Sequence, residues 1–479
     1  MSFFTSVKSF PRTFWLANTM ELFERWAYYG MFAVLSVYLT DPVSKGGLGF
    51  SQEQRGIMQA VVTGILYLLP IIGGAIADRF GFRKVLLAAF VTLASGYFAM
   101  GQFHAYAPVF VAFLVVAVGG AIFKPVIVAT VSKTTAKNSD TLGFGIFYMI
   151  VNVGGFIGPY AASKLRDIDW QLVFLMCAVV ILINLVLLFF YKEPKTGDKK
   201  KKEPLSQAIK QILKNTAIVL KDTKFVLFLL IIVGFWTMYM QLFFTIPVYI
   251  TQWIDTSVVY NRLGILKNLI GFIEDGTGII RPEMMINVPA LTIIIFQVIV
   301  SSILTNVKPV KSMIVGLIVV AVGMGQMAFY VSGWYILMGL VILAFGEMAS
   351  SPRIQEYISR IAPKEKVALY MGYSFLPLAG GNLLGGLLSG KLYAEMSDKY
   401  AFLRDYLVRE GIEKMDQITN IDDAVLFTRS MDKLNMSSGQ LTDLLYQTYD
   451  PGSIFLIFGG IGIATSVLLI LYNKFILSK

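Results

Sequence analysis

Apolar residues in this chain form long runs that are separated by shorter polar segments. A helix needs about 20 residues to cross roughly 30 Å of hydrocarbon, and twelve runs reach that length. We therefore expect an all-α polytopic membrane protein with 12 transmembrane helices. They are predicted near residues 14–40, 55–77, 85–103, 107–131, 141–163, 170–191, 224–250, 285–306, 311–332, 335–361, 368–392 and 452–476.

The polar segment after the sixth run divides the chain into two halves. It contains KEPKTGDKKKKEP and leaves six runs on each side. With both termini cytoplasmic, 25 Lys and Arg lie on the cytoplasmic side and 14 on the outer side, as the positive-inside rule requires. We predict an N-terminal six-helix bundle at 1–191, a basic cytoplasmic linker at 192–223 and a C-terminal six-helix bundle at 224–479. The linker is either a loop that sets topology or a contact for anionic lipids.

Composition supports a membrane protein and excludes several other classes. Hydrophobic residues make up 56% of the chain and charged residues 15%, which is too apolar for an ordinary soluble domain. The net charge of +11 comes from basic residues between the apolar runs, so we expect the bilayer and no nucleic acid as a partner. The expected location is the plasma (inner) membrane.

Motifs for enzyme chemistry are missing from the sequence. Cys177 is the single cysteine, so neither a disulfide framework nor a cysteine-based metal site is available. No P-loop, HExxH pair or GxSxG elbow is present, which argues against an ATP-driven pump, a zinc protease or a serine hydrolase. We expect no enzyme, no metal site and no cofactor, with a proton gradient as the energy source.

The first apolar run contains the charged stretch ELFERWAYYG, residues 21–30. Glu21, Glu24, Arg25 and Tyr28 share one helix face, with Tyr29 alongside. A charge facing lipid costs about 2.5–3.5 kcal/mol on insertion scales. These charges must therefore face the protein interior, either as a structural ion pair or as the lining of a hydrated cavity.

Other runs in both halves also carry polar residues at their centres: Lys124, Asn152, Asn287 and Glu347. Carboxylates paired with cations in such a place can bind and release protons as the partners separate. That exchange is the physical requirement for coupling solute movement to a proton gradient. Each asparagine is either an interhelical hydrogen bond or a substrate contact.

Two six-helix halves joined by a basic loop indicate the major facilitator fold, in which two pseudo-symmetric bundles enclose a central site. The loop after the second run reads GGAIADRFGFRK, residues 73–84. It resembles the facilitator loop motif and supplies the candidate gating residues Gly74, Asp78, Arg79 and Arg83. The simpler interpretation of this loop is a basic segment that only fixes topology.

Two longer motifs carry a family resemblance. ELFERWAYYG resembles the ExxERFxYYG motif of the proton-dependent oligopeptide transporter (POT) family, and FGIFYMIVNVGGF, residues 144–156, resembles the span-five signature of that family. Tyr67, Lys124, Asn287 and Glu347 also align with functional positions. The resemblance extends from the first to the eleventh run.

The resemblance implies a symporter that imports di- and tripeptides or peptide-like solutes with protons by alternating access. It assigns proton coupling to Glu21, Glu24, Arg25 and Lys124, and it implies that Glu347 attracts the amino terminus of the peptide. We expect a monomer. The implied substrate-binding residues are Tyr28, Tyr29, Tyr67, Lys124, Asn152, Trp236, Asn287 and Glu347.

Several positions depart from the family pattern. Phe32 stands where many members have an arginine, Met240 where they have the span-seven glutamate, and Ser374 where they have an aromatic residue. We therefore expect an altered pocket, suited to more apolar or bulkier peptides or to a non-peptide organic anion. The alternatives are a facilitator for another amphiphilic solute and a nutrient sensor that does not transport.

An acidic, polar insertion separates the last two runs, at residues 393–451. Apolar positions recur at helical spacing near 401–408, 424–434 and 441–446, and Ser438 is a candidate helix cap. We predict a small helical lid outside the membrane, which is either a solvated insertion without a role or an element for gating or partner docking. Residues 254–284 form a shorter outer loop.

Overall fold

The computed structural model describes residues 10–135, 140–194, 205–274, 276–329, 331–363 and 366–477. Most of the predicted basic linker motif, at 195–204, lies outside these residues. The described part of the chain is almost entirely helical, with one antiparallel hairpin. This helical content confirms the predicted all-α class.

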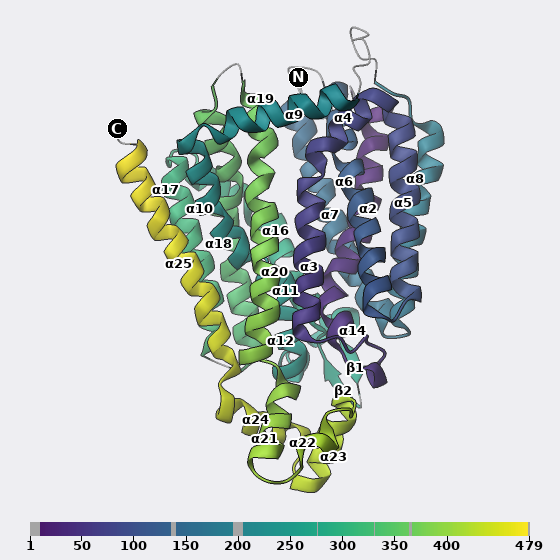
Figure 1. Cartoon of the computed structure of the whole chain (residues 1–479), viewed down its shortest axis with the longest axis vertical. Helices are drawn as coiled ribbons and strands as arrows, with labels where there is room; N and C mark the ends of the chain where they lie inside the picture. Colours follow the sequence, from purple (N-terminus) through teal and green to yellow (C-terminus); the bar gives the residue numbers. More distant parts are fainter. Residues whose placement is uncertain are drawn as a thin grey trace. The chain divides into compact units, whose positions relative to one another are not determined.

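The first half of the chain contains long helices joined by short turns (Figure 1). A helix that was not predicted, α9, lies within the linker region, where apolar residues recur every three or four positions. The bounds of the helices are α2 Arg12–Thr40, η1 Val43–Lys45, α3 Gln52–Leu68, α4 Pro70–Phe80, α5 Phe82–Gln102, α6 Tyr106–Thr134, α7 Asp140–Arg166, α8 Trp170–Phe190 and α9 Leu205–Leu220.

The second half has more interruptions. The seventh predicted span is divided into α10 Thr223–Tyr239, α11 Gln241–Phe244 and α12 Ile246–Trp253. The outer loop that follows holds α13 Ser257–Tyr260, η2 Gly264–Leu266, α14 Lys267–Ile270, and a hairpin of β1 Phe272–Glu274 and β2 Thr277–Ile279. The remaining helices before the insertion are α15 Pro282–Met285, α16 Val288–Leu304, α17 Pro309–Gly325, η3 Gln326–Ala328, α18 Gly333–Ile361, α19 Val367–Gly372, η5 Tyr373–Phe375 and α20 Leu376–Met396.

Ten segments among the described residues are helical, long and apolar enough to cross a bilayer. They correspond to ten of the twelve predicted spans. The other two predicted spans coincide with α2 and with α19–α20. Charged residues lower the apolarity of α2, and α20 is rich in glycine. Their membrane placement stays a prediction.

The chain forms two compact units. The first unit comprises Met1–Phe32, Val62–Leu230 and Gln355–Ala379, and the second comprises Ala33–Val61, Ile231–Ile354 and Gly380–Lys479. The division into bundles at 1–191 and 224–479 stays a prediction.

Helix packing in the first unit depends on glycine. α5 lies against α6 and α8 (Figure 1). A methyl group on Gly96 of α5 would lie 2.9 Å from the backbone nitrogen of Val116, and one on Gly119 of α6 would lie 3.0 Å from that of Leu93. The two helices therefore approach each other through small residues, as is common in membrane proteins.

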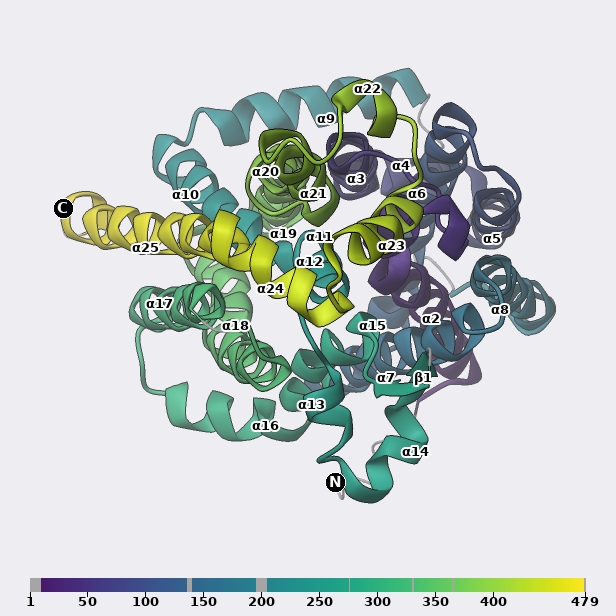
Figure 2. The ribbon, with the colours of Figure 1, turned by 90° about the horizontal axis from the view of Figure 1, so that it is seen from below.

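In the second unit, glycine also allows close helix packing, where α17 lies against the last span, α25 Ile454–Tyr472 (Figure 2). A methyl group on Gly459 of α25 would lie 3.1 Å from the carbonyl oxygen of Ala321. α25 is followed by the π-helical turn η7 Asn473–Leu477.

The insertion between α20 and α25 is helical, as predicted. It contains α21 Lys399–Arg409, α22 Met415–Ile418, α23 Asp423–Leu434, α24 Ser438–Tyr449 and η6 Pro451–Ser453. The cap of α24 is Ser437, so the choice of Ser438 was wrong. Ser437 accepts from the backbone of Gln440, and the Gln440 side chain accepts from the backbone of Ser437. This reciprocal capping box selects the earlier serine.

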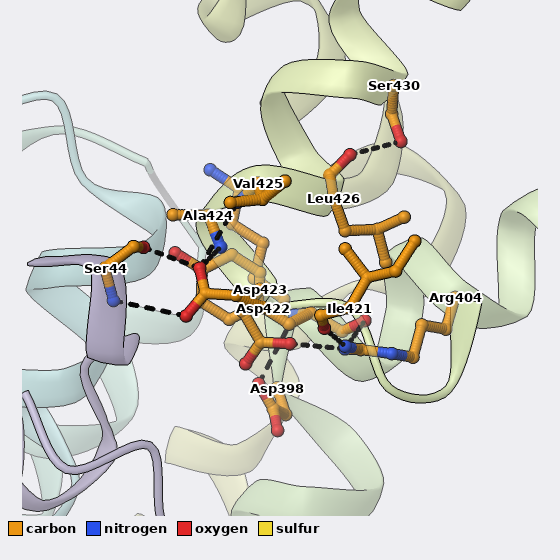
Figure 3. Close-up of polar contacts among 12 residues, drawn as sticks. Ser44, Asp398, Arg404, Ile421, Asp422, Asp423, Ala424, Val425, Leu426 and Ser430 are labelled. Atoms are coloured by element: carbon orange, nitrogen blue, oxygen red, sulfur yellow. Dashed lines mark hydrogen bonds and ion pairs between the residues drawn. The ribbon is translucent and has the colours of Figure 1, made fainter. Parts of the chain in front are cut away.

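Hydrogen bonds fix the insertion to other parts of the second unit. The indole of Trp253 in α12 donates to the carbonyl of Ser397 at 2.7 Å. Figure 3 shows a second attachment, in which the hydroxyl of Ser44 in η1 donates to Oδ1 of Asp422 at 2.6 Å. Asp422 also caps α23. The insertion is therefore an ordered part of this unit.

Candidate functional site

The charged stretch of α2 forms an ion-pair cluster in the first unit. Nε and Nη2 of Arg25 donate to the two carboxylate oxygens of Glu24 at 2.6 and 2.8 Å. The same Nε lies 3.5 Å from Oε1 of Glu21. Both carboxylates are fully buried, at 0% and 1% exposure. As predicted, the three charges face the protein interior.

Lys124 of α6 completes this cluster. Its ammonium group donates to Oε1 of Glu21, so each carboxylate has a cation. Two carboxylates and two cations give the cluster no net charge when all four are ionised. The partner of Lys124 in this structure is Glu21 of the same unit. The other oxygen of Glu21 has no hydrogen-bond partner among the described residues.

Aromatic rings surround the two cations. The guanidinium carbon of Arg25 lies 4.8 Å from the ring centre of Tyr28 and 5.7 Å from that of Tyr29. Nζ of Lys124 lies 5.2 Å from the ring centre of Phe147 in α7. Tyr67 of α3 neighbours Tyr28 and Arg25. Rings placed over cations stabilise charge away from water.

Gly154 of the span-five signature, and Gly158 just after it, bring α7 close to this part of α2. A methyl group on Gly158 would lie 2.4 Å from the carbonyl oxygen of Trp26, and one on Gly154 would lie 2.9 Å from Cβ of Arg25. No side chain fits at either position without movement of the helices. The two motifs that resemble the POT family therefore belong to one packed contact.

Glu347 has its own environment in the second unit. Its Oε2 accepts a hydrogen bond of 2.5 Å from the hydroxyl of Tyr239, the last residue of α10. Trp236 packs edge-on against the Tyr239 ring, with centroids 5.7 Å apart. Gly381 of α20 provides the room for Trp236, because its ideal Cβ would lie 2.2 Å from Cβ of Trp236.

The two predicted asparagines differ in their surroundings. The side-chain amide of Asn152 donates to the carbonyl of Tyr148 at 2.8 Å, one turn earlier in α7. Asn287 is buried at the start of α16 in the second unit. A substrate contact by either residue stays a prediction. So does the convergence of the Glu21 cluster and Glu347 on one hydrated chamber.

The predicted gating loop lies between α4 and α5. The backbone N–H of Arg83 donates to Glu193 at 2.7 Å, and Arg79 lies over the ring of Phe80. Gly81 has φ +89° and its ideal Cβ would lie 3.2 Å from Glu193, so this turn requires glycine. The surroundings of Gly74 and Asp78 lie outside what the structure describes.

One buried cation was not predicted from the sequence. Arg55 of α3 is fully buried in the second unit. It donates to Gln52, Gln59, the carbonyl of Phe244 and the hydroxyl of Ser389. It stands at the first residue of the predicted second span, where a basic residue is ordinary. Only the packing of α3 against other helices of the unit reveals that it is buried.

Glu283 of α15 was also missed, and it is fully buried. Its apolar neighbours Met284 and Met285 were the only available signal for an interior position. Among the described residues, no group of three or more His, Cys, Asp or Glu could hold a metal ion.

A family model connects this arrangement with known proteins. The model of the Major Facilitator Superfamily matches residues 14–273 and 253–403, which is most of the chain. The protein belongs to the Major Facilitator Superfamily. It is accordingly a multi-pass membrane transporter and no enzyme, as predicted.

The relatives of this facilitator include an ion antiporter and a peptide permease. A Na(+), Li(+), K(+)/H(+) antiporter of Planococcus maritimus is 24% identical over 396 residues, which are 79% of this chain and 89% of that protein. Dipeptide and tripeptide permease B of Yersinia enterocolitica is 30% identical over 185 residues. That match covers 37% of this chain and 36% of the permease, so it spans little more than a third of either protein.

Solved structures show which facilitator fold is present. A POT family transporter in complex with 5-aminolevulinic acid matches with a TM-score of 0.71. The match covers 98% of this chain and 99% of the other, at 18% identity. The facilitator described here therefore has the fold of POT transporters. The predicted resemblance to that family is confirmed by this fold and by the permease relatives.

Proposed function

We propose that the protein is a proton-coupled symporter that imports di- and tripeptides or peptide-like solutes by alternating access, with both termini cytoplasmic. The observation that carries this proposal is the buried cluster of Glu21, Glu24, Arg25 and Lys124. The names of the permease relatives and of the POT structures support the class of substrate.

The charge balance of the cluster explains how it couples protons to movement. Removing one partner from a buried ion pair leaves an uncompensated charge, at a cost of about 3–5 kcal/mol. If Lys124 moves away from Glu21, binding a proton removes that charge from the interior. A change of conformation that separates α6 from α2 is thereby linked to proton uptake, and its reversal to proton release.

Buried charges of both signs are available to bind a zwitterion. A short peptide carries a carboxylate and an ammonium group. Arg25 and Lys124 can receive the carboxylate, and Glu347 can receive the ammonium group. Met240, which replaces the span-seven glutamate of the family, is buried between α10 and α11. This substitution supports an altered range of more apolar or bulkier cargo.

Reconstitution into liposomes tests the proposal. An inward proton gradient should drive accumulation of labelled dialanine. Glu21→Gln and Glu24→Gln should abolish accumulation and leave exchange between labelled and unlabelled dialanine intact. Glu395→Gln is the matched control, because it makes the same substitution at an exposed glutamate in the last turn of α20. This variant should behave as wild type. Full accumulation by both cluster variants would contradict the assigned role.

A second candidate function is exchange of a monovalent cation for protons. It is favoured by the antiporter of Planococcus maritimus, which this chain matches over most of both lengths. The same liposomes, loaded with a pH dye, distinguish the two. Proton efflux on addition of Na⁺, Li⁺ or K⁺ without dialanine uptake would favour the exchanger.

A further inference from the structure

Tyr239 is held in one orientation by its own helix. Its ring stacks against Phe235 at 5.9 Å and meets Trp236 edge-on at 5.7 Å. These residues stand four and three positions earlier, on the same face of α10. The side chain is 8% exposed. The hydroxyl therefore has little freedom, and it is directed at Oε2 of Glu347.

A phenol hydroxyl bound to a carboxylate occupies one of its oxygens. A carboxylate can accept an ammonium group on either oxygen, and it binds best when both are available. With Oε2 of Glu347 engaged by Tyr239, an incoming amine meets a carboxylate whose charge is already partly satisfied.

The next residue, Met240, has no hydrogen-bond donor that could compete with Tyr239 for Glu347. α10 therefore presents a neutral hydrogen-bond donor to α18, and the pair lies within one unit.

We infer that Tyr239 is a specificity-determining residue that competes with the amino group of the substrate for Glu347. The inference rests on the proposed peptide function and deepens it. Wild-type protein then distinguishes only weakly between peptides with a free amino terminus and peptides whose amino terminus is blocked. Cargo that makes most of its contacts elsewhere is tolerated.

Tyr239→Phe tests this competition, because it removes the hydroxyl and keeps the ring that Phe235 and Trp236 hold. The measurement is the ratio of apparent affinities for dialanine and N-acetyl-dialanine in the liposome uptake assay. A hydrogen bond to a charged group corresponds to roughly a tenfold change in affinity. We expect the ratio to rise about tenfold in favour of dialanine.

Two further variants separate this role from a structural one. Tyr239→Phe combined with Glu347→Gln should lose the gain, because no carboxylate remains to receive the amine. Tyr249→Phe removes another buried hydroxyl of the second unit, which pairs with the hydroxyl of Tyr446 at 3.1 Å. It should leave the ratio unchanged.

The outcomes are distinguishable. If wild-type protein takes up dialanine and Tyr239→Phe leaves the ratio unchanged or lowers it, the competition is refuted and the peptide function stands. If wild-type protein takes up neither peptide, the proposed function fails and this inference fails with it. Infrared spectroscopy provides a readout without transport. The carboxylate band that Glu347→Gln removes should shift in Tyr239→Phe, and an unshifted band would overturn the inference.

Discussion

Lys124 of α6 and Glu21 of α2 form a hydrogen-bonded ion pair in the first unit, and Arg25 approaches the same carboxylate oxygen. With Glu24 bound by Arg25, the charges balance two against two. This balance explains how a helix with three charges at its centre is tolerated in an apolar run. A lone ion pair on α2 would have left one carboxylate uncompensated.

Removing Lys124 should therefore be costly. In Lys124→Gln, Glu21 loses its hydrogen-bonded cation while it stays fully buried. We expect a loss of about 3–5 kcal/mol in the free energy of unfolding, measured by denaturant unfolding in detergent. The double variant Lys124→Gln with Glu21→Gln should recover a large part of it.

Lys133→Gln is the control for this experiment. Lys133 is exposed near the end of the same helix, with its ammonium group over the ring of Phe82, and its substitution should cost at most about 1 kcal/mol. Equal losses for both lysines would show that the pairing with Glu21 is unimportant for stability.

The contact between α2 and α7 should tolerate no side chain at Gly158. An added methyl group would lie 2.4 Å from the carbonyl oxygen of Trp26 and 2.7 Å from the backbone nitrogen of Gly30. Backbone atoms cannot rotate away, so Gly158→Ala should destabilise the protein by about 1–3 kcal/mol. Gly145→Ala in the same helix meets no atom within 4 Å and should be neutral or slightly stabilising. Thermal unfolding of the two variants side by side checks the contrast.

The local stability of the chain where α20 meets the insertion should depend on pH in two opposite ways. Burial, and then the charge of Asp423, raises the pKa of Asp398 from 3.8 to about 6. Burial, and then Lys45, lowers the pKa of Lys399 from 10.5 to about 7. Both residues begin α21, and both prefer their neutral form in the folded state.

The sign of each effect follows from proton binding. Between pH 4 and 6 the folded state holds the Asp398 proton and the unfolded chain has released it, so stability falls as pH rises. Between pH 7 and 10 the unfolded chain still holds the Lys399 proton, so stability rises with pH. We expect a minimum of local stability between pH 6 and 7.

Hydrogen exchange of α21, corrected for the intrinsic exchange rate, measures this minimum. Asp398→Asn keeps a capping side chain and should flatten the acidic limb, and Lys399→Met should flatten the alkaline limb. Identical pH profiles for wild type and both variants would refute the assignment.

The contact between η1 and α23 should stay closed during transport. Ser44 lies in the loop after the first predicted span and Asp422 in the insertion (Figure 3), and both belong to the second unit. Alternating access moves whole bundles against each other, so a covalent link inside one unit should leave the cycle intact. Ser44→Cys with Asp422→Cys should cross-link on oxidation, and uptake should be unchanged.

Each single cysteine variant is the control for the cross-link. The native Cys177 is buried and should not react under mild oxidation. A loss of uptake on oxidation that is restored by reduction would show instead that this contact opens during the cycle.

The sequence by itself determined the class of the protein and the positions of most helices. Apolar runs need about 20 residues to span a bilayer, and charges within such a run must face other protein groups. Both constraints act locally, so the motif around Glu21 and the helices of the insertion could be located before any coordinates. The interior orientation of Glu24 and Arg25 followed from helical spacing, which puts them on one face, together with the cost of a charge that faces lipid.

Only the tertiary structure decided which groups are partners. The pairing of Lys124 with Glu21, the hydroxyl of Tyr239 on Glu347 and the neutral cage of Arg55 all join residues from different helices. Helix periodicity fixes the face on which a side chain lies, but it contains no information about the rotation and approach of the neighbouring helix. Those depend on packing at glycines such as Gly158 and Gly381, where the absence of a side chain lets two backbones meet.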